Sequence, residues 1–256
     1  MTQVAVQGQI WNYEEIRDGL HGRPQALSAQ AGSPLLVLHG WGRSGNEWIE
    51  MAKELSACSG RKAYVVDLPG FGGSSLPKVK DIYEYTELVV KFCEYLSIDK
   101  VILVGHSLGG RVGIVLGAKH SKLVEQLVLN DPAGVKPNSI KRTIFKTIAI
   151  FFAWIPQTLR AKIVATVMDE DYRNSPTNRE LYRAIVKDDL RICLPHIKCK
   201  TWVIWGEKDK ILPLVLVDIY KKLLPYPVVR VIWEAGHDPH LSHPQKLLRV
   251  LEELWT

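Results

Sequence analysis

A serine stands between two glycines in the segment Gly105-His-Ser-Leu-Gly109, which fits the pattern G-x-S-x-G. The apolar residues 101–104 before it are typical of a buried strand, and residues 111–119 after it have the composition of a helix. A sharp turn between them strains the backbone at Ser107 and leaves no room for side chains at 105 and 109, which explains both glycines. The pattern therefore predicts an exposed nucleophile, Ser107, near a helix N-terminus whose free N–H groups can stabilise an oxyanion.

A serine nucleophile needs a base that takes its proton and a carboxylate that orients the base. Neutral imidazole suits this role near pH 7 because its unperturbed pKa is about 6.5. Among the eight histidines, His237 lies behind a glycine, in the loop that follows the last predicted strand, 228–233. Asp209 comes just past another predicted strand, 201–205, where its carboxylate can turn toward the serine. We therefore expect Ser107, His237 and Asp209 to act as nucleophile, base and acid.

Other polar residues compete for these roles. Asp131 also follows a predicted strand and is the second candidate for the acid. We interpret Asp67 as an aspartate that holds its own loop through backbone N–H groups. The remaining histidines near the motifs are interpreted as structural: His39 braces the loop after its strand, His106 points away from the serine, His240 packs under the C-terminal helix and His243 lies at the exposed start of that helix.

A second glycine-containing loop, 39–45, follows the apolar run 34–38. Glycines at 40 and 42 let the backbone turn so that the N–H of Trp41 points toward the site. Together with the N–H of Leu108, it would form the oxyanion hole. The nucleotide-binding patterns G-x-G-x-x-G and G-x-x-x-x-G-K-[ST] do not match here.

Apolar runs at 34–38, 63–66, 101–104 and 123–129 alternate with segments of helical periodicity, such as 81–96. Continuous apolar runs are typical of strands buried on both faces, and the alternation predicts an α/β fold with a mostly parallel, doubly wound sheet. In such sheets the active site lies beyond the carboxyl ends of the strands, where Ser107 and Asp131 would sit.

The alternation stops after Gly134. Apolar residues at helical spacing in 140–155 and 159–167, and a helix start near 175–180, predict three helices without a strand. We therefore divide the chain into a core, 1–135 and 196–256, and an inserted helical cap, 136–195, whose apolar faces roof the serine. Contact of the cap with a membrane surface through Lys141, Arg142 and Lys146 is the less favoured alternative.

The composition bounds the remaining possibilities. With 46% hydrophobic and 23% charged residues the chain is an ordinary globular protein, and its 256 residues suffice for one large domain. The four cysteines show neither a C-x-x-C nor a zinc spacing, so reduced thiols, no metal and no cofactor are expected. A net charge of +6 without a long basic run does not indicate nucleic-acid binding. No secretory signal is visible, so a cytoplasmic protein, monomeric or dimeric, is the simplest expectation.

Together these motifs resemble the α/β-hydrolase fold family with a lid, and in particular its small cofactor-independent esterases and C–C bond hydrolases. The matching segments are His39-Gly-Trp-Gly42, Asp67-Leu-Pro-Gly-Phe-Gly-Gly-Ser74, Gly105-His-Ser-Leu-Gly-Gly110, Trp205-Gly-Glu-Lys-Asp209 and Ala235-Gly-His237. The chain order Ser107, Asp209, His237 is also the order of this fold. Dehalogenases and epoxide hydrolases of the fold have an aspartate where Ser107 stands, so the resemblance disfavours them.

The resemblance implies a serine hydrolase that cleaves small to medium, largely apolar carboxylic esters through an acyl-enzyme. A C–C bond hydrolase or acyltransferase with the same triad remains an alternative, for which Arg111 or Arg142 would have to bind an acid group. A non-catalytic small-molecule receptor on this fold is the alternative from a different class.

Overall fold

One eight-stranded sheet runs through the computed structural model, which describes residues 1–17, 32–136 and 179–255. The strand order is β1-β2-β4-β3-β5-β6-β7-β8. The strands are β1 (Thr2–Val6), β2 (Gln9–Ile16), β3 (Leu35–Leu38), β4 (Ala63–Asp67), β5 (Val101–His106), β6 (Val124–Asn130), β7 (Lys200–Gly206) and β8 (Pro227–Ile232). All pairs from β4 to β8 are parallel, which confirms the predicted α/β class with a mostly parallel sheet.

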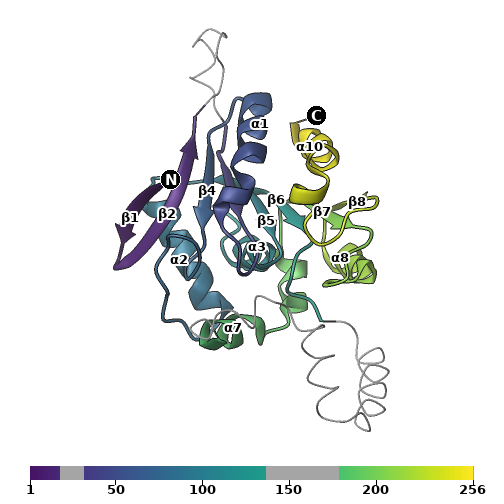
Figure 1. The fold of residues 1–256 in the computed structure, drawn as a ribbon. Helices are drawn as coiled ribbons and strands as arrows, with labels where there is room; N and C mark the ends of the chain where they lie inside the picture. Colours follow the sequence, from purple (N-terminus) through teal and green to yellow (C-terminus); the bar gives the residue numbers. More distant parts are fainter. Residues whose placement is uncertain (18–31, 137–178, 256) are drawn as a thin grey trace, which may run out of the picture.

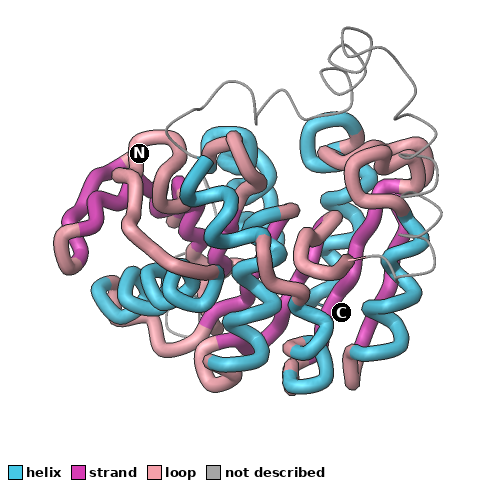
Figure 2. The backbone as a smooth tube through the Cα atoms, turned by 90° about the horizontal axis from the view of Figure 1, so that it is seen from below, coloured by secondary structure: helices cyan, strands magenta, loops and turns pink. Residues whose placement is uncertain are grey.

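An antiparallel hairpin, β1 and β2, extends one end of the sheet (Figure 2). Its turn is formed by Gln7 and Gly8, both with positive φ (49° and 84°), a combination that matches the right-handed twist of the flanking strands. Trp11 and Tyr13 of β2 face inward, where Trp11 stacks on Phe92 with ring centroids 4.6 Å apart. The hairpin therefore belongs to the main hydrophobic core.

Helices cover both faces of the sheet (Figure 1). The α-helices are α1 (Ile49–Ser59), α2 (Ile82–Tyr95), α3 (Leu108–Lys119), α7 (Arg179–Val186), α8 (Val217–Leu223), α9 (Pro239–Ser242) and α10 (Pro244–Glu252). Short 3-10 turns are η2 (Gly45–Trp48), η5 (Leu190–Ile192), η6 (Leu194–His196), η7 (Leu214–Leu216) and η8 (Glu253–Trp255). α1 and α10 pack on one face and α2, α3 and α8 on the other, so the sheet is buried on both sides as the apolar strands predicted.

The strand order reverses between β3 and β5, because β4 lies on one side of β3 and β5 on the other. The loop after β3 and the loop after β5 therefore leave the same edge of the sheet in opposite directions. In open α/β sheets such a switch point opens a crevice at the carboxyl ends of the strands. Ser107 follows β5 and the Gly40–Trp41 loop follows β3, so both border this crevice.

Residues 179–195, which we assigned to the cap, pack on α2 and α3. Leu181 and Ile185 of α7, with Leu190 and Leu194 after it, belong to the same buried cluster as α3. The predicted helices 140–155 and 159–167, with Lys141, Arg142 and Lys146, lie outside the described residues, and the division into core and cap stays a prediction. Within the described ranges no helix is long and apolar enough to cross a bilayer.

Candidate active site

Ser107 occupies a sharp turn between β5 and α3. Its backbone has φ 48° and ψ −104°, a conformation that side-chain-bearing residues rarely adopt. A Cβ at Gly109 would lie 2.2 Å from the carbonyl oxygen of Leu38, and a Cβ at Gly105 would lie 2.4 Å from that of Gly109. The two glycines therefore let the turn pack against β3 and the start of α3, as the sequence predicted.

The strained turn is held by its neighbours on both sides. The Ser107 N–H donates to the carbonyl of Asn130 at the end of β6 (3.1 Å), and the Gly109 N–H donates to that of His39 after β3 (3.0 Å). The Ser107 carbonyl accepts hydrogen bonds from the N–H groups of Arg111 and Ala133. Because strands on both sides fix the turn, the strain at Ser107 is compensated by the surrounding structure.

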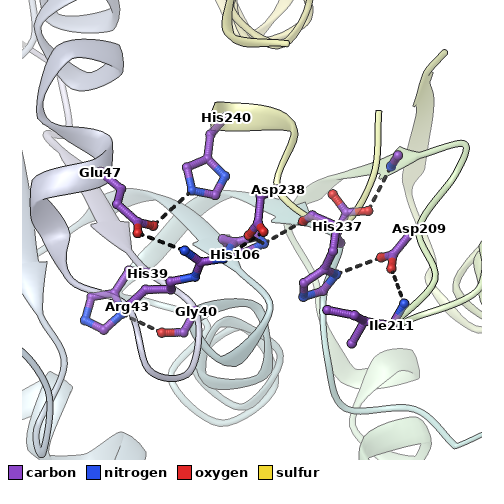
Figure 3. A network of polar contacts seen from close by, with 12 residues as sticks. His39, Gly40, Arg43, Glu47, His106, Asp209, Ile211, His237, Asp238 and His240 are labelled. Carbon is purple, nitrogen blue, oxygen red and sulfur yellow. Dashed lines mark hydrogen bonds and ion pairs between the residues drawn. The ribbon is translucent and has the colours of Figure 1, made fainter. Parts of the chain in front are cut away.

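Asp209 and His237 form a hydrogen-bonded pair, drawn in Figure 3. His237 Nδ1–H donates to Asp209 Oδ2 over 2.7 Å, while Oδ1 accepts the backbone N–H groups of Ile211 and Leu212 at 2.8 Å each. The Asp209 side chain is fully buried and that of His237 is 11% exposed. With the proton on Nδ1, the other ring nitrogen, Nε2, is free to accept a proton.

The loops that carry this pair meet because Gly206 has no side chain. A Cβ there would lie 2.0 Å from the carbonyl oxygen of Gly236, immediately before His237. The Lys208 N–H also donates to the carbonyl of Ala235 (2.8 Å), which joins the loop after β7 to the loop after β8. Two segments about 28 residues apart in sequence are thereby locked at the spacing that the Asp209–His237 bond requires.

A small cavity of about 80 Å³ brings the predicted residues together. Its lining residues come from the end of β5 and from the loops after β3, β5, β7 and β8: Gly40, Trp41, Arg43, His106, Ser107, Ile211, His237 and Asp238. Ser107, His237 and Trp41 therefore face one space, and Asp209 stands behind His237. Leu108 is the first residue of α3, so its N–H has no acceptor within the helix.

Trp41 is fixed by aromatic neighbours. Its ring makes edge contacts with Phe71 and Tyr182, at centroid distances of 4.8 and 5.0 Å. Behind it, His39 accepts the Leu68 N–H at Nε2 (2.9 Å) and donates from Nδ1 to the Gly40 carbonyl (2.6 Å). Burial lowers the pKa of His39, which favours the neutral ring that this hydrogen-bond pattern requires. The predicted bracing role of His39 is thus observed.

Asp67 also holds the loops around the site, and its reach is wider than expected. Oδ1 accepts the Gly45 N–H (2.7 Å) and Oδ2 accepts the Gly73 N–H (2.8 Å) and the Asn12 side-chain amide (2.7 Å). One buried carboxylate therefore ties the loop after β4 to the start of η2 and to β2. Asp67 does not line the cavity, in agreement with a structural role.

A polar network that the sequence did not predict lies beside His237 (Figure 3). Arg43 pairs with Asp238 at 2.9 Å and with Glu47 at 3.2 Å, and the buried ring of His240 lies 3.4 Å from Glu47. The ring of His240 stacks on that of Trp48, with centroids 4.4 Å apart. The sequence predicted that this ring packs under the C-terminal helix. The sequence does show a charged residue beside each of two motifs, Arg43 after the Gly40–Gly42 loop and Asp238 after His237. Because the two residues are 195 positions apart, their pairing could not be predicted.

His106 links this network to the site. Its buried ring lines the cavity, and Nε2–H donates to the backbone carbonyl of His237 (2.9 Å). Burial holds the pKa of His106 well below its ordinary value, and the nearby His240 and His237 act in the same direction. His106 is therefore a neutral donor that supports the His237 loop.

Asp131, the rival acid, is also close. Its buried Oδ1 accepts the Gly206 N–H (2.8 Å), and polar atoms of Asp131, Asp209 and His237 all lie within 4.8 Å of one another. Burial raises the pKa of Asp131 well above its ordinary value, and the charge of Asp209 raises it further. The ring of His237 nevertheless bonds to Asp209, so the geometry favours Asp209 as the partner.

Two groups of side chains in the described ranges have the composition of a metal site, namely His106, Asp238 and His240, and the group Asp131, Asp209 and His237. In the first, Arg43 already places a positive charge on Asp238. In the second, Asp209 and His237 bond to each other. Neither group thus offers a set of uncommitted ligands, and the absence of a metal stays a prediction.

Arg111 does not face the cavity. Its guanidinium is buried and donates to the backbone carbonyls of Ile185 (2.5 Å) and Asp188 at the end of α7. It therefore anchors α7 and the residues directly after it to α3. Arg142, the other candidate for binding an acid group, lies outside the described residues.

Comparisons with known proteins agree with this architecture. A family model described as alpha/beta hydrolase fold matches residues 33–168, a stretch that includes the Trp41 loop and the Ser107 turn. The chain belongs to the α/β-hydrolase fold family. Asp209 and His237 lie outside the matched stretch, so their pairing rests on the geometry alone.

Among its relatives, Lipase 1 of Psychrobacter immobilis is 27% identical over 233 residues, which cover 82% of this chain and 72% of the lipase. A pimeloyl-[acyl-carrier protein] methyl ester esterase of Salmonella heidelberg is 27% identical over 248 residues, covering 86% of this chain and 93% of the relative. The solved structure of an esterase from Exiguobacterium antarcticum superposes with a TM-score of 0.73 at 20% identity, over 99% of this chain and 98% of the esterase. At that identity the likeness supports the fold.

Proposed function

We propose that this protein is a serine hydrolase that cleaves small to medium, largely apolar carboxylic esters through an acyl-enzyme. The observation that carries the proposal is the 2.7 Å bond between Asp209 and the Nδ1 of His237, because His237 and the strained Ser107 line one cavity. The two relatives named as a lipase and a methyl ester esterase support an ester as the substrate.

In this mechanism His237 Nε2 takes the proton of the Ser107 hydroxyl as the oxygen attacks the ester carbonyl. The tetrahedral intermediate carries its negative charge on the former carbonyl oxygen, which the N–H groups of Trp41 and Leu108 stabilise. Each such donor contributes on the order of 3 kcal/mol to transition-state stabilisation. His237 then gives its proton to the leaving alcohol, and the acyl group stays on Ser107.

Water completes the cycle by the same route. His237 takes a proton from water, the hydroxide attacks the acyl carbonyl, and the acid leaves as Ser107 regains its proton. During both halves the imidazolium of His237 is stabilised by the buried carboxylate of Asp209, which two backbone N–H groups keep in place.

The alternatives of a C–C bond hydrolase or an acyltransferase use the same three residues. Arg111, one candidate for binding an acid group, is committed to backbone carbonyls at the end of α7, so it offers no support for a substrate carboxylate. The cleavage of simple esters is therefore the preferred activity. A receptor without turnover remains the alternative that the first experiment must exclude.

The test compares hydrolysis of p-nitrophenyl esters of increasing acyl length by the purified wild type and Ser107→Ala. We expect Ser107→Ala to lower kcat by about 10⁶ without unfolding the protein. Ser121→Ala, two residues beyond the end of α3, is the matched control and should keep wild-type activity. An apolar ligand that binds the wild type without any turnover would support the receptor instead.

A further inference from the structure

Asp131 is a buried acid that the proposed mechanism does not use. It follows β6, has a positive φ of 43° and exposes none of its surface. Its N–H donates to the carbonyl of Ile204 (2.9 Å), and Oδ1 accepts the N–H of Gly206 (2.8 Å). The other oxygen, Oδ2, is buried, and no N–H or O–H group of the described residues donates a hydrogen bond to it. An anionic oxygen at this position would therefore be unsatisfied.

The groups around Asp131 make a second negative charge unfavourable there. Asp209, from the loop after β7, lies with His237 within 4.8 Å of it, and the Asp209 side chain is itself fully buried. Asp238, beyond His237, adds another negative charge. Tyr220 of α8 donates to the carbonyl of the neighbouring Pro132 and stays neutral, because burial raises its pKa. Two buried carboxylates at this separation do not both ionise readily.

The acid that keeps the proton can be assigned from hydrogen bonding. Asp209 accepts three N–H donors, from Ile211, Leu212 and His237, and each of them stabilises its anion. Asp131 accepts one, from Gly206. Burial and the charge of Asp209 both raise the pKa of Asp131, and the Gly206 N–H opposes this only in part.

We propose that Asp131 is a positioning residue that retains its proton and donates a hydrogen bond from its Oδ2–H to Asp209. The two carboxyl groups together then hold one proton and one negative charge, and His237 faces that single charge. The inference rests on the proposed function, in which Asp209 orients His237. The Asp131 hydroxyl is then the fourth hydrogen-bond donor to the Asp209 carboxylate, after the N–H groups of Ile211, Leu212 and His237.

A neutral Asp131 and an ionised one predict different pH profiles for Asp131→Asn. The amide keeps the shape of the side chain, an acceptor for the Gly206 N–H and a donor toward Asp209. If Asp131 is neutral, the variant leaves the acidic midpoint of the kcat/KM profile within about 0.3 pH units and kcat within about threefold of the wild type. If Asp131 is ionised, removal of its charge lowers that midpoint by roughly one pH unit or more, which would overturn the proposal.

Infrared spectroscopy tests the same assignment without using activity. At pH 8, where exposed carboxyl groups are ionised, the protein should show the carbonyl stretch of a protonated carboxylic acid, shifted by ¹³C-aspartate labelling and absent from Asp131→Asn. The labelled wild type suffices should the variant fail to fold. A spectrum without that band at pH 8 refutes the proposal.

Infrared spectra and ester hydrolysis are both measured on the wild type and on Ser107→Ala, because the two readouts together separate the two proposals. A band in a protein whose ester hydrolysis does not depend on Ser107 would contradict the proposed function and leave the protonation of Asp131 standing. Ser107-dependent hydrolysis without the band would contradict only the role of Asp131.

Discussion

The change Asp209→Asn tests the central pair most informatively, because the structure fixes which way the amide must face. Oδ1 of Asp209 accepts the N–H groups of Ile211 and Leu212, so the oxygen of an asparagine would stay there. Its Nδ2 would then occupy the place of Oδ2, 2.7 Å from His237 Nδ1, and donate a hydrogen bond to that nitrogen. The proton of a neutral imidazole would move to Nε2, which could no longer accept the proton of Ser107.

The expected loss in kcat is about 10⁴, which corresponds to about 5.4 kcal/mol of transition-state stabilisation, as for the same change in another serine hydrolase triad. Because both backbone bonds survive, the melting temperature should change little. The assay is the steady-state hydrolysis of p-nitrophenyl acetate, with kcat and KM measured separately. Glu207→Gln is the control, because it is the same type of change two positions earlier on a half-buried side chain that bonds to the Glu234 N–H and not to His237. It should keep kcat within about twofold.

An Asp209→Asn protein that is folded and keeps more than a tenth of the wild-type kcat would refute the argument. If that retained activity then disappeared in the double variant Asp209→Asn/Asp131→Asn, Asp131 would be the acid. If it persisted, neither carboxylate would orient the base.

Two predictions concern stability. Asp67→Ala removes the acceptor of the buried Gly45 N–H, of the Gly73 N–H and of the Asn12 amide. The free energy of unfolding by urea should therefore fall by on the order of 3 kcal/mol, and a loss below about 1 kcal/mol would show that the loops hold without this carboxylate. His106 has a pKa lowered by burial, so below about pH 6.5 the unfolded chain binds a proton that the folded protein does not. Its contribution is therefore intact above that pH and lost below it, by up to about 1.4 kcal/mol per pH unit, and this slope should disappear from urea titrations of a folded His106→Asn variant.

The sequence predicted the residues that approach one another along a single edge of the sheet. A buried strand followed by a glycine-containing polar loop recurs at Ser107, Asp209 and His237, and parallel strands bring their carboxyl ends to the same edge. The local steric requirement of Gly105 and Gly109 was also predictable, since it depends only on the turn between one strand and the next helix.

Contacts that depend on strand order and register could not be predicted. Asp131 meets Asp209 because β6 and β7 are neighbours and Asn130 pairs with Ile204, which sets the end of β6 beside Gly206. Arg43 and Asp238 pair because the loops after β3 and β8, strands that are not neighbours in the sheet, both reach the same cavity. Arg111 belongs to the helix after the serine, yet its partners are carbonyls 74 and 77 positions later. Only the folded backbone supplies these neighbours.

The most direct test of the account is the site of covalent modification by a fluorophosphonate, which reacts with serine nucleophiles activated by a neighbouring base. The wild type should be labelled with one equivalent, found by peptide mass spectrometry on Ser107, in parallel with the loss of ester hydrolysis, whereas Ser107→Ala should remain unlabelled and inactive. Hydrolysis that continues in fully labelled protein or in Ser107→Ala would contradict the account.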